Sequence, residues 1–209
     1  MRVDEVLAAA SVIPVLEVEK LADAAPLALA LAEGGLRVVE LTLRTACALD
    51  ALGAMKAAAP SLIVGMGTVR TVQDIAASQV AGADFLVSPG ASRALLESLA
   101  DCALPALPGV ATASEAMEAA EAGFQALKFF PAEAAGGAPY LKSLSGPLPD
   151  LRFCPTGGVS PANAATYFAI PSVACVGGSW IATRAAIRDG RFDDIARLAA
   201  EAHALKPGP

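Results

Sequence analysis

Short apolar runs alternate with longer alanine- and leucine-rich stretches along almost the whole chain, and this alternation restricts the fold more than any other feature. The intervening stretches have helix length, and a short amphipathic helix is expected near residues 3–10. Strands regularly separated by helices indicate a parallel sheet of βα units. The eight predicted strands are Val12–Val18, Arg37–Leu43, Leu62–Gly67, Asp84–Ser88, Pro105–Gly109, Ala126–Phe130, Arg152–Thr156 and Val173–Gly177.

Eight such units predict an α/β fold, namely a closed parallel (β/α)8 barrel of the TIM type, near the small end of that fold's range. An open doubly wound sheet is the alternative, although it more often has fewer units and a switch point. No linker, low-complexity segment or charge run divides the 209 residues, so we expect one barrel domain over residues 1–209. The tail from Lys206 to Pro209 is expected to be frayed.

Composition narrows the classes of function. A net charge of -6 argues against a nucleic-acid partner or an anionic membrane surface, so any positive site must be a local pocket. No apolar run has the length of a membrane span and no export signal is visible, which favours a cytoplasmic protein. A hydrophobic share of 55% suggests a buried subunit interface. Four widely spaced cysteines without a C-x-x-C motif predict reduced, buried thiols: Cys47, Cys102, Cys154 and Cys175.

The scarcity of histidine limits the possible chemistry. The only histidine, His203, lies in the C-terminal tail after the last alanine-rich helix, which argues against a Ser-His or Cys-His pair and against a His-rich zinc site. Proton transfer would then depend on a carboxylate, a lysine, a tyrosine or water.

Lys128 is the most informative single residue, because it lies inside the apolar strand Ala126–Phe130. Strand alternation places it on one face with Ala126 and Phe130, and neither face has the composition of a wet surface. Burial disfavours the charged ammonium and increases the share of neutral amine, which is the nucleophilic form. The alternatives are a lysine that extends its charged end to the surface and one paired with a structural carboxylate.

A second strand carries an unexpected carboxylate. In Val38–Arg44 the alternation places Glu40, Thr42 and Arg44 on one face, with Glu40 inside the barrel and Arg44 at its mouth. A carboxylate in this position is costly unless it is paired or functional. A purely structural Glu40–Arg44 ion pair is the alternative to a catalytic role.

Polar residues and glycines follow the C-terminal ends of several strands, where this fold builds its active sites. Thr68 follows the glycine-containing run Gly65-Met66-Gly67, which lacks the third glycine of a dinucleotide-binding motif. Pro89 and Gly90 have the composition of an ordinary turn. Gly157-Gly158 and Gly177-Gly178-Ser179 follow the seventh and eighth strands, where backbone N–H groups often bind phosphate, although glycine also ends strands for steric reasons.

At these residues the chain resembles the family of 2-keto-3-deoxy-6-phosphogluconate (KDPG) and 4-hydroxy-2-oxoglutarate (KHG) aldolases, which are class I, Schiff-base enzymes. The likeness covers almost the whole chain. It is strongest at Val39–Thr45, Gly65–Val69, Ser88–Gly90, Pro108–Val110, Lys128–Glu133, Phe153–Gly158 and Val176–Trp180.

The resemblance implies a role for each of these side chains. Lys128 would form the Schiff base and Glu40 would be the general acid and base. No cofactor or metal would be needed, because the iminium polarises the substrate. The implied substrate-binding residues are Arg44 and Thr68 for the pyruvate carboxylate, Phe130 over the imine, Pro89 and Thr156 nearby, and Gly157, Gly158, Gly178 and Ser179 around a phosphate.

The resemblance also implies the substrates and the assembly. KDPG would be cleaved to pyruvate and glyceraldehyde 3-phosphate in the Entner-Doudoroff pathway, KHG to pyruvate and glyoxylate, and the chain would form a homotrimer. Met66 and Glu17 depart from the family's pattern, and Glu17 is expected to weaken anion binding nearby. Two other functions stay open: a non-catalytic barrel that binds a sugar phosphate, and a phosphate-binding isomerase-type barrel.

Overall fold

The computed structural model describes residues 1–205, so the predicted fraying of Lys206–Pro209 lies outside the described part. The strands are β1 (Val12–Leu16), β2 (Val38–Thr42), β3 (Ile63–Gly67), β4 (Leu86–Val87), β5 (Ala106–Leu107), β6 (Gly109–Val110), β7 (Ala126–Phe129), β8 (Arg152–Pro155) and β9 (Val176–Gly178). The helices are α1 (Val3–Ala8), α2 (Ala24–Glu33), α3 (Ala48–Ala58), α4 (Val72–Val80), α5 (Arg93–Ala100), α6 (Ala113–Glu121), α7 (Gly137–Ser145), α8 (Ala164–Phe168), α9 (Arg184–Arg188) and α10 (Phe192–His203), with a 3-10 turn η1 (Leu21–Asp23).

All eight predicted strands have an observed counterpart; the ends of the strands differ by one or more residues, and two strands differ further. The predicted strand Pro105–Gly109 is divided into β5 and β6 at Pro108, because proline cannot donate a ladder hydrogen bond. The last strand begins at Val176 rather than Val173, although Val173 forms an isolated parallel bridge with Phe153.

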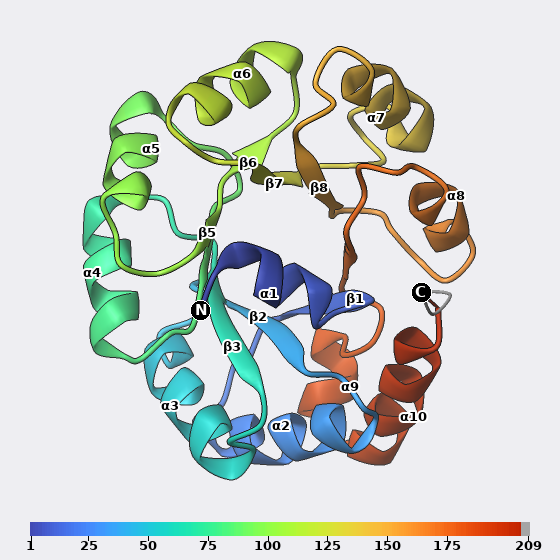
Figure 1. The fold of residues 1–209 in the computed structure, drawn as a ribbon. Coiled ribbons are helices and arrows are strands. Elements are labelled where there is room, and N and C mark those ends of the chain that lie inside the picture. The colour runs from blue at the N-terminus through green and yellow to red at the C-terminus, as the bar shows by residue number, and fades with distance from the viewer. Residues whose placement is uncertain (206–209) are drawn as a thin grey trace.

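All strand pairs in the described chain are parallel, as alternating strands and helices require. One sheet has the order β5-β4-β3-β2-β1-β9 and a second has the order β6-β7-β8. The strands curl around the middle of the molecule, and helices α2 to α10 lie outside them (Figure 1). The carboxyl ends of the strands therefore meet at one edge of the curled sheet, where side chains from distant parts of the sequence come together.

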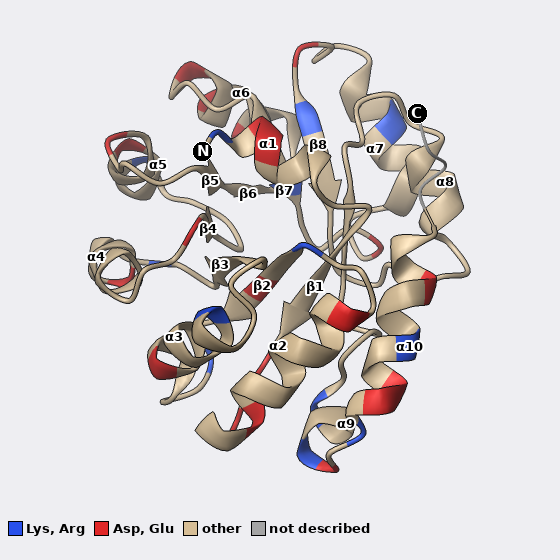
Figure 2. Ribbon diagram, turned by 60° about the horizontal axis from the view of Figure 1, so that its bottom comes forward, with Lys and Arg blue, Asp and Glu red and all other residues tan. Residues whose placement is uncertain are grey.

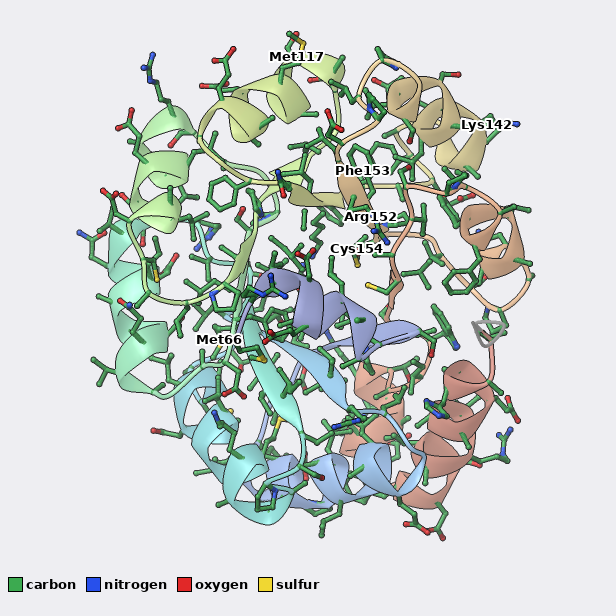
Figure 3. The ribbon with its side chains drawn as sticks, viewed as in Figure 1. Met66, Met117, Lys142, Arg152, Phe153 and Cys154 are labelled. Atoms are coloured by element: carbon green, nitrogen blue, oxygen red, sulfur yellow. The ribbon has the colours of Figure 1, made fainter. Side chains whose placement is uncertain are left out.

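The two faces of each strand belong to different apolar clusters. Residues such as Leu41, Leu127 and Phe153 belong to the outer cluster, which packs beneath the helices. Figure 3 shows Phe153 and its neighbour Cys154 on opposite sides of β8, with Cys154 toward the middle of the molecule. Strand alternation thus separates a helix-facing core from a smaller inner core.

Helix α1 closes the amino-terminal end of the inner core. Its residues Val6 and Leu7 are buried against side chains at the starts of the strands, including Ile13, Val38 and Ala126. Figure 1 shows α1 lying across the middle of the curled strands. The opposite, carboxyl-terminal end of the strands is not covered by this helix.

Charged residues lie mainly on helices and loops, whereas the strands carry few of them (Figure 2). Within residues 1–205, no helix is both long and apolar enough to cross a membrane. Cys154 and Cys175 are buried as predicted, but the prediction of buried thiols is wrong for Cys47 and Cys102, which are half-buried. His203 is the last residue of α10 and does not follow that helix as predicted.

Candidate active site

Lys128 is buried inside the curled sheet. It lies in β7 between the outer residues Leu127 and Phe129, and its side chain is only 6% exposed. Its Nζ donates hydrogen bonds to Glu40 Oε1 at 3.0 Å and to Oε2 at 3.3 Å. A buried amine that contacts a single carboxylate has both a nucleophile and a proton acceptor within hydrogen-bond reach.

Glu40 comes from β2, far from Lys128 in the sequence, and its side chain is only 5% exposed. The carboxylate fits because Gly67 of β3 has no side chain: a Cβ there would lie 2.2 Å from Glu40 Oε1. The alternative considered for Glu40, a structural ion pair with Arg44, does not form, since Glu40 pairs with Lys128. Gly65, the other glycine of β3, has a steric reason too, because a Cβ there would lie 2.3 Å from the Phe85 ring.

Arg44 and Thr68, which the family resemblance assigns to one carboxylate, meet at the carboxyl ends of β2 and β3. Arg44 Nε donates to Thr68 Oγ1 at 3.1 Å, and Arg44 is largely exposed at the mouth. Thr68 has a φ of 62°, a backbone conformation that is strained for a β-branched residue. Such strain is often kept where it aims a side chain at a functional site. The pair presents a guanidinium and a hydroxyl at the carboxyl ends of β2, which carries Glu40, and of its neighbour β3.

Phe130 lies close to the lysine, and the loop after β8 packs against Phe130. The Phe130 ring centroid is 5.3 Å from Lys128 Nζ, within the range of a cation–π contact. Gly157 and Gly158 both have positive φ, and a Cβ on Gly157 would lie 3.2 Å from the Phe130 ring. Thr156 precedes them with a buried hydroxyl that donates to the Cys154 carbonyl at 3.3 Å. The loop is thereby held against the aromatic ring.

The glycines predicted to bind phosphate also have steric reasons to be glycine. A Cβ on Gly177 would lie 2.2 Å from Thr156 Oγ1, and one on Gly178 would lie 1.8 Å from the Trp180 ring. A Cβ on Gly158 would lie 2.6 Å from Glu133 Cγ. Ser179 follows β9 and is exposed at the same end of the sheet. The two Gly-Gly pairs are therefore weaker evidence for a phosphate site than the sequence suggested, because close packing already explains these glycines.

Three further positions named from the sequence, Pro89, Met66 and Glu17, lie in different places relative to Lys128 and Glu40. Pro89 follows β4 and packs its backbone against Gly109, the register partner of Lys128, so it lies one strand away from the lysine. Met66 belongs to the outer cluster beneath the helices and does not face the site. Glu17 follows β1 and forms ion pairs with Arg44 at 3.9 Å and with Arg184 at 2.6 Å. Sequence reasoning missed Arg184, which lies in a helix with no pattern to distinguish it.

A second pair that sequence reasoning missed supports the loop after β8. The hydroxyl of buried Tyr167, on α8, donates to the Glu133 carboxylate. Burial raises the pKa of Tyr167 well above its ordinary value of 10.0, and the Glu133 carboxylate raises it further. The Glu133 N–H also donates to the Gly157 carbonyl at 3.0 Å. The pair thus connects α8 with the segment after β7 and with the glycine loop.

In residues 1–205, no three His, Cys, Asp or Glu side chains are grouped so that they could hold a metal ion. The groups that the site brings together are an amine, a carboxylate, a guanidinium and hydroxyl groups. An amine beside a carboxylate can add to a ketone and exchange protons with it.

Comparisons with known proteins point to the same chemistry. A family model described as "Aldolase: KDPG and KHG aldolase" matches residues 3–198. The chain belongs to this family. It is 46% identical to the KHG/KDPG aldolase of Escherichia coli (strain K12) over 199 residues, which cover 95% of this chain and 93% of that protein. It is also 46% identical to the 2-dehydro-3-deoxy-phosphogluconate aldolase of Pseudomonas aeruginosa, with 96% and 91% covered.

Solved structures of KDPG aldolases have the same fold. One is from Legionella pneumophila, with pyruvate captured at low pH as a covalent carbinolamine intermediate. It is 44% identical to this chain and has a TM-score of 0.95, and the match covers 98% of this chain and 99% of that one. Another, from Zymomonas mobilis ZM4 with 3-phosphoglycerate, is 44% identical and has a TM-score of 0.91. That match covers 99% of this chain and 97% of the other. Membership of an aldolase family confirms the predicted enzyme class, a carbon–carbon lyase.

Proposed function

We propose that this aldolase cleaves KDPG to pyruvate and glyceraldehyde 3-phosphate, and KHG to pyruvate and glyoxylate, through a Schiff base on Lys128. The observation that carries the proposal is the buried pair of Lys128 and Glu40, with Nζ 3.0 Å from Oε1. The carbinolamine seen in the Legionella relative is the adduct expected when an amine adds to the ketone of pyruvate.

The first half of the reaction forms the imine. Lys128 gives a proton to Glu40 across their hydrogen bond, and the freed lone pair attacks the C2 ketone of the substrate. Glu40 then returns the proton to the carbinolamine oxygen, which leaves as water. Arg44 and Thr68 hold the carboxylate next to that ketone, and Phe130 covers the imine.

The second half breaks the carbon chain. The protonated imine accepts the electron pair of the C3–C4 bond as Glu40 takes the proton of the C4 hydroxyl, and the aldehyde leaves. The resulting enamine is protonated at C3, and water hydrolyses the iminium to pyruvate and free Lys128. A single carboxylate serves every proton transfer if a water molecule relays between positions. The iminium provides the electron sink, so these steps need neither metal nor cofactor.

Binding of the distal phosphate is assigned to the end of the sheet near β8 and β9. Backbone groups of Gly157, Gly158 and Gly178, with the Ser179 hydroxyl, would surround it, while Thr156 and Pro89 border the substrate. The exposure of Ser179 at the strand ends supports this assignment.

The architecture proposed for this enzyme is one closed (β/α)8 barrel domain over residues 1–209. Support comes from two observations at the gaps between the sheets. β5 and β6 are consecutive pieces of one strand interrupted at Pro108, and isolated parallel bridges join Phe153 to Val173 and Thr156 to Gly177. A homotrimer in the cytoplasm, which would bury part of the high apolar content, is the proposed assembly.

Steady-state kinetics on both substrates test the proposal. Pyruvate release would be measured with purified protein and either KDPG or KHG, with Lys128→Arg as the inactive control, because a guanidinium stays protonated and cannot form an imine. We expect kcat/KM to be about 100-fold higher for KDPG, since remote phosphate binding can be used to align the C3–C4 bond. Absence of cleavage of both substrates by the wild type would refute the assigned activity.

A further inference from the structure

Glu17 and Arg184, which have no role in the proposed reaction, form a charged cluster with Arg44 at the mouth of the site. Arg184 Nη2 lies 2.6 Å from Glu17 Oε2, and Arg44 Nη1 lies 3.9 Å from the same oxygen. The Glu17 side chain is 13% exposed, whereas that of Arg184 is 60% exposed. One carboxylate thus faces two guanidinium groups, and Arg184 keeps donors that are free to meet a ligand.

The cluster lies on the same inner face as the lysine and farther toward the mouth. Ile13 belongs to the inner cluster and Leu16 to the outer one, so strand alternation places Val15 on the inner face, and Glu17 directly follows the end of β1. Val15 is the register partner of Glu40. Glu17 is two residues further along the strand direction, which is roughly 7 Å. The substrates differ in the same direction. The phosphate of KDPG lies farther from the ketone carbon than does the second carboxyl group of KHG.

A cavity of about 270 Å³ joins this cluster to Ser179. Its lining includes Glu17, Arg44, Ser179, Thr183 and Arg184. The two arginines and the glutamate leave one positive charge in excess, in a protein whose net charge is -6. Within residues 1–205 the Ser179 hydroxyl has no hydrogen-bond partner, so it is available to a ligand. The expectation that Glu17 weakens anion binding therefore overlooked its two cationic partners.

We propose that Arg184 is a specificity-determining residue that binds the phosphate of the substrate at this cavity, with its guanidinium positioned by Glu17. The proposal rests on the aldolase function above and assigns a side-chain phosphate ligand in addition to the backbone groups after β8 and β9. A planar guanidinium binds phosphate through two parallel hydrogen bonds, which a substrate lacking the phosphate cannot use at the same distance. Arg184 thus favours phosphorylated 2-keto-3-deoxy acids over shorter ones.

The test compares Arg184→Gln with wild type on KDPG and KHG at about 0.15 M salt, where long-range attraction between exposed charges is screened. We expect kcat/KM for KDPG to fall about 30-fold and that for KHG to change less than about threefold. Arg197→Gln is the matched control, because Arg197 on α10 is 59% exposed and also pairs with carboxylates but does not line the cavity. This control should leave both values unchanged.

A double variant with an unchanged net charge tests whether Arg184 binds the phosphate directly or only neutralises the charge of Glu17. Glu17→Gln with Arg184→Gln removes one charge of each sign, so the cavity keeps the excess of one positive charge that Arg44 supplies. Direct binding predicts that the preference for KDPG stays lost in this variant. A return to the wild-type preference, or an unchanged preference in Arg184→Gln, would overturn the proposal while the aldolase function stands. If the wild type cleaves neither substrate, the function and this proposal fall together.

Discussion

Gly67→Ala tests whether the position of Glu40 against Lys128 controls the chemistry. A Cβ on Gly67 would lie 2.2 Å from Glu40 Oε1 and 2.6 Å from Cγ, and its backbone has no positive φ that would prevent alanine. The carboxylate must therefore move by about 1 Å or more, which can lower turnover by about 100-fold. The crowded contact should also lower the free energy of unfolding by about 1–3 kcal/mol.

Two assays distinguish this effect from misfolding. Turnover of KDPG is measured under saturating substrate, and the free energy of unfolding is measured by urea titration. Gly53→Ala is the control, because Gly53 lies in α3 and a Cβ added there would have nothing within 4 Å. It should keep wild-type turnover and stabilise the helix by about 0.5–1 kcal/mol. A folded Gly67→Ala variant with turnover within about threefold of wild type would refute the reasoning.

Three further outcomes are expected. Glu40→Gln should still bind pyruvate but turn over about 100-fold more slowly, since a positioned acid and base is lost; near-normal turnover would assign the proton transfers to another group. Tyr167→Phe should lower the free energy of unfolding by about 1–2 kcal/mol at pH 8, and the difference from wild type should narrow at pH 11. The raised pKa of Tyr167 keeps its phenol neutral in the folded protein, whereas the phenol of the unfolded chain ionises above pH 10.0. The contribution of Tyr167 to stability is therefore lost as pH rises. A difference between the two proteins that does not depend on pH in urea titrations would contradict this reasoning. Incubation with EDTA should leave cleavage unchanged, and loss of activity that a divalent ion restores would indicate a metal-dependent reaction instead.

Strand periodicity was sufficient to predict the inner face of the site. The pattern placed Lys128 and Glu40 inside apolar strands and Arg44 at the mouth, and the structure confirms each position. The reason is that alternation fixes which side chains share a face, whatever the length of chain between two strands. The helix-facing position of Met66 follows from the same rule.

Pairings across the sheet could not be predicted in the same way. The sequence left Glu40 with Arg44 as its possible partner, because those two residues share a strand, whereas the partner found is Lys128, 88 residues away. Gly67 could be understood only with the Glu40 carboxylate beside it. Arg184 begins the short helix α9, which packs against α10, and its ion pair with Glu17 joins residues 167 positions apart, so no local pattern in the sequence could indicate it.

Borohydride trapping tests the central claim, that Lys128 forms the imine, most directly. The protein is incubated with pyruvate and sodium borohydride, and the reduced adduct is located by peptide mass spectrometry. Lys142 is the internal control, because it lies on α7, is exposed, and points away from the curled strands (Figure 3). We predict inactivation with one pyruvyl adduct on Lys128 and no adduct in Lys128→Arg. An adduct on Lys142, or continued cleavage of KDPG without any adduct, would contradict the Schiff-base assignment.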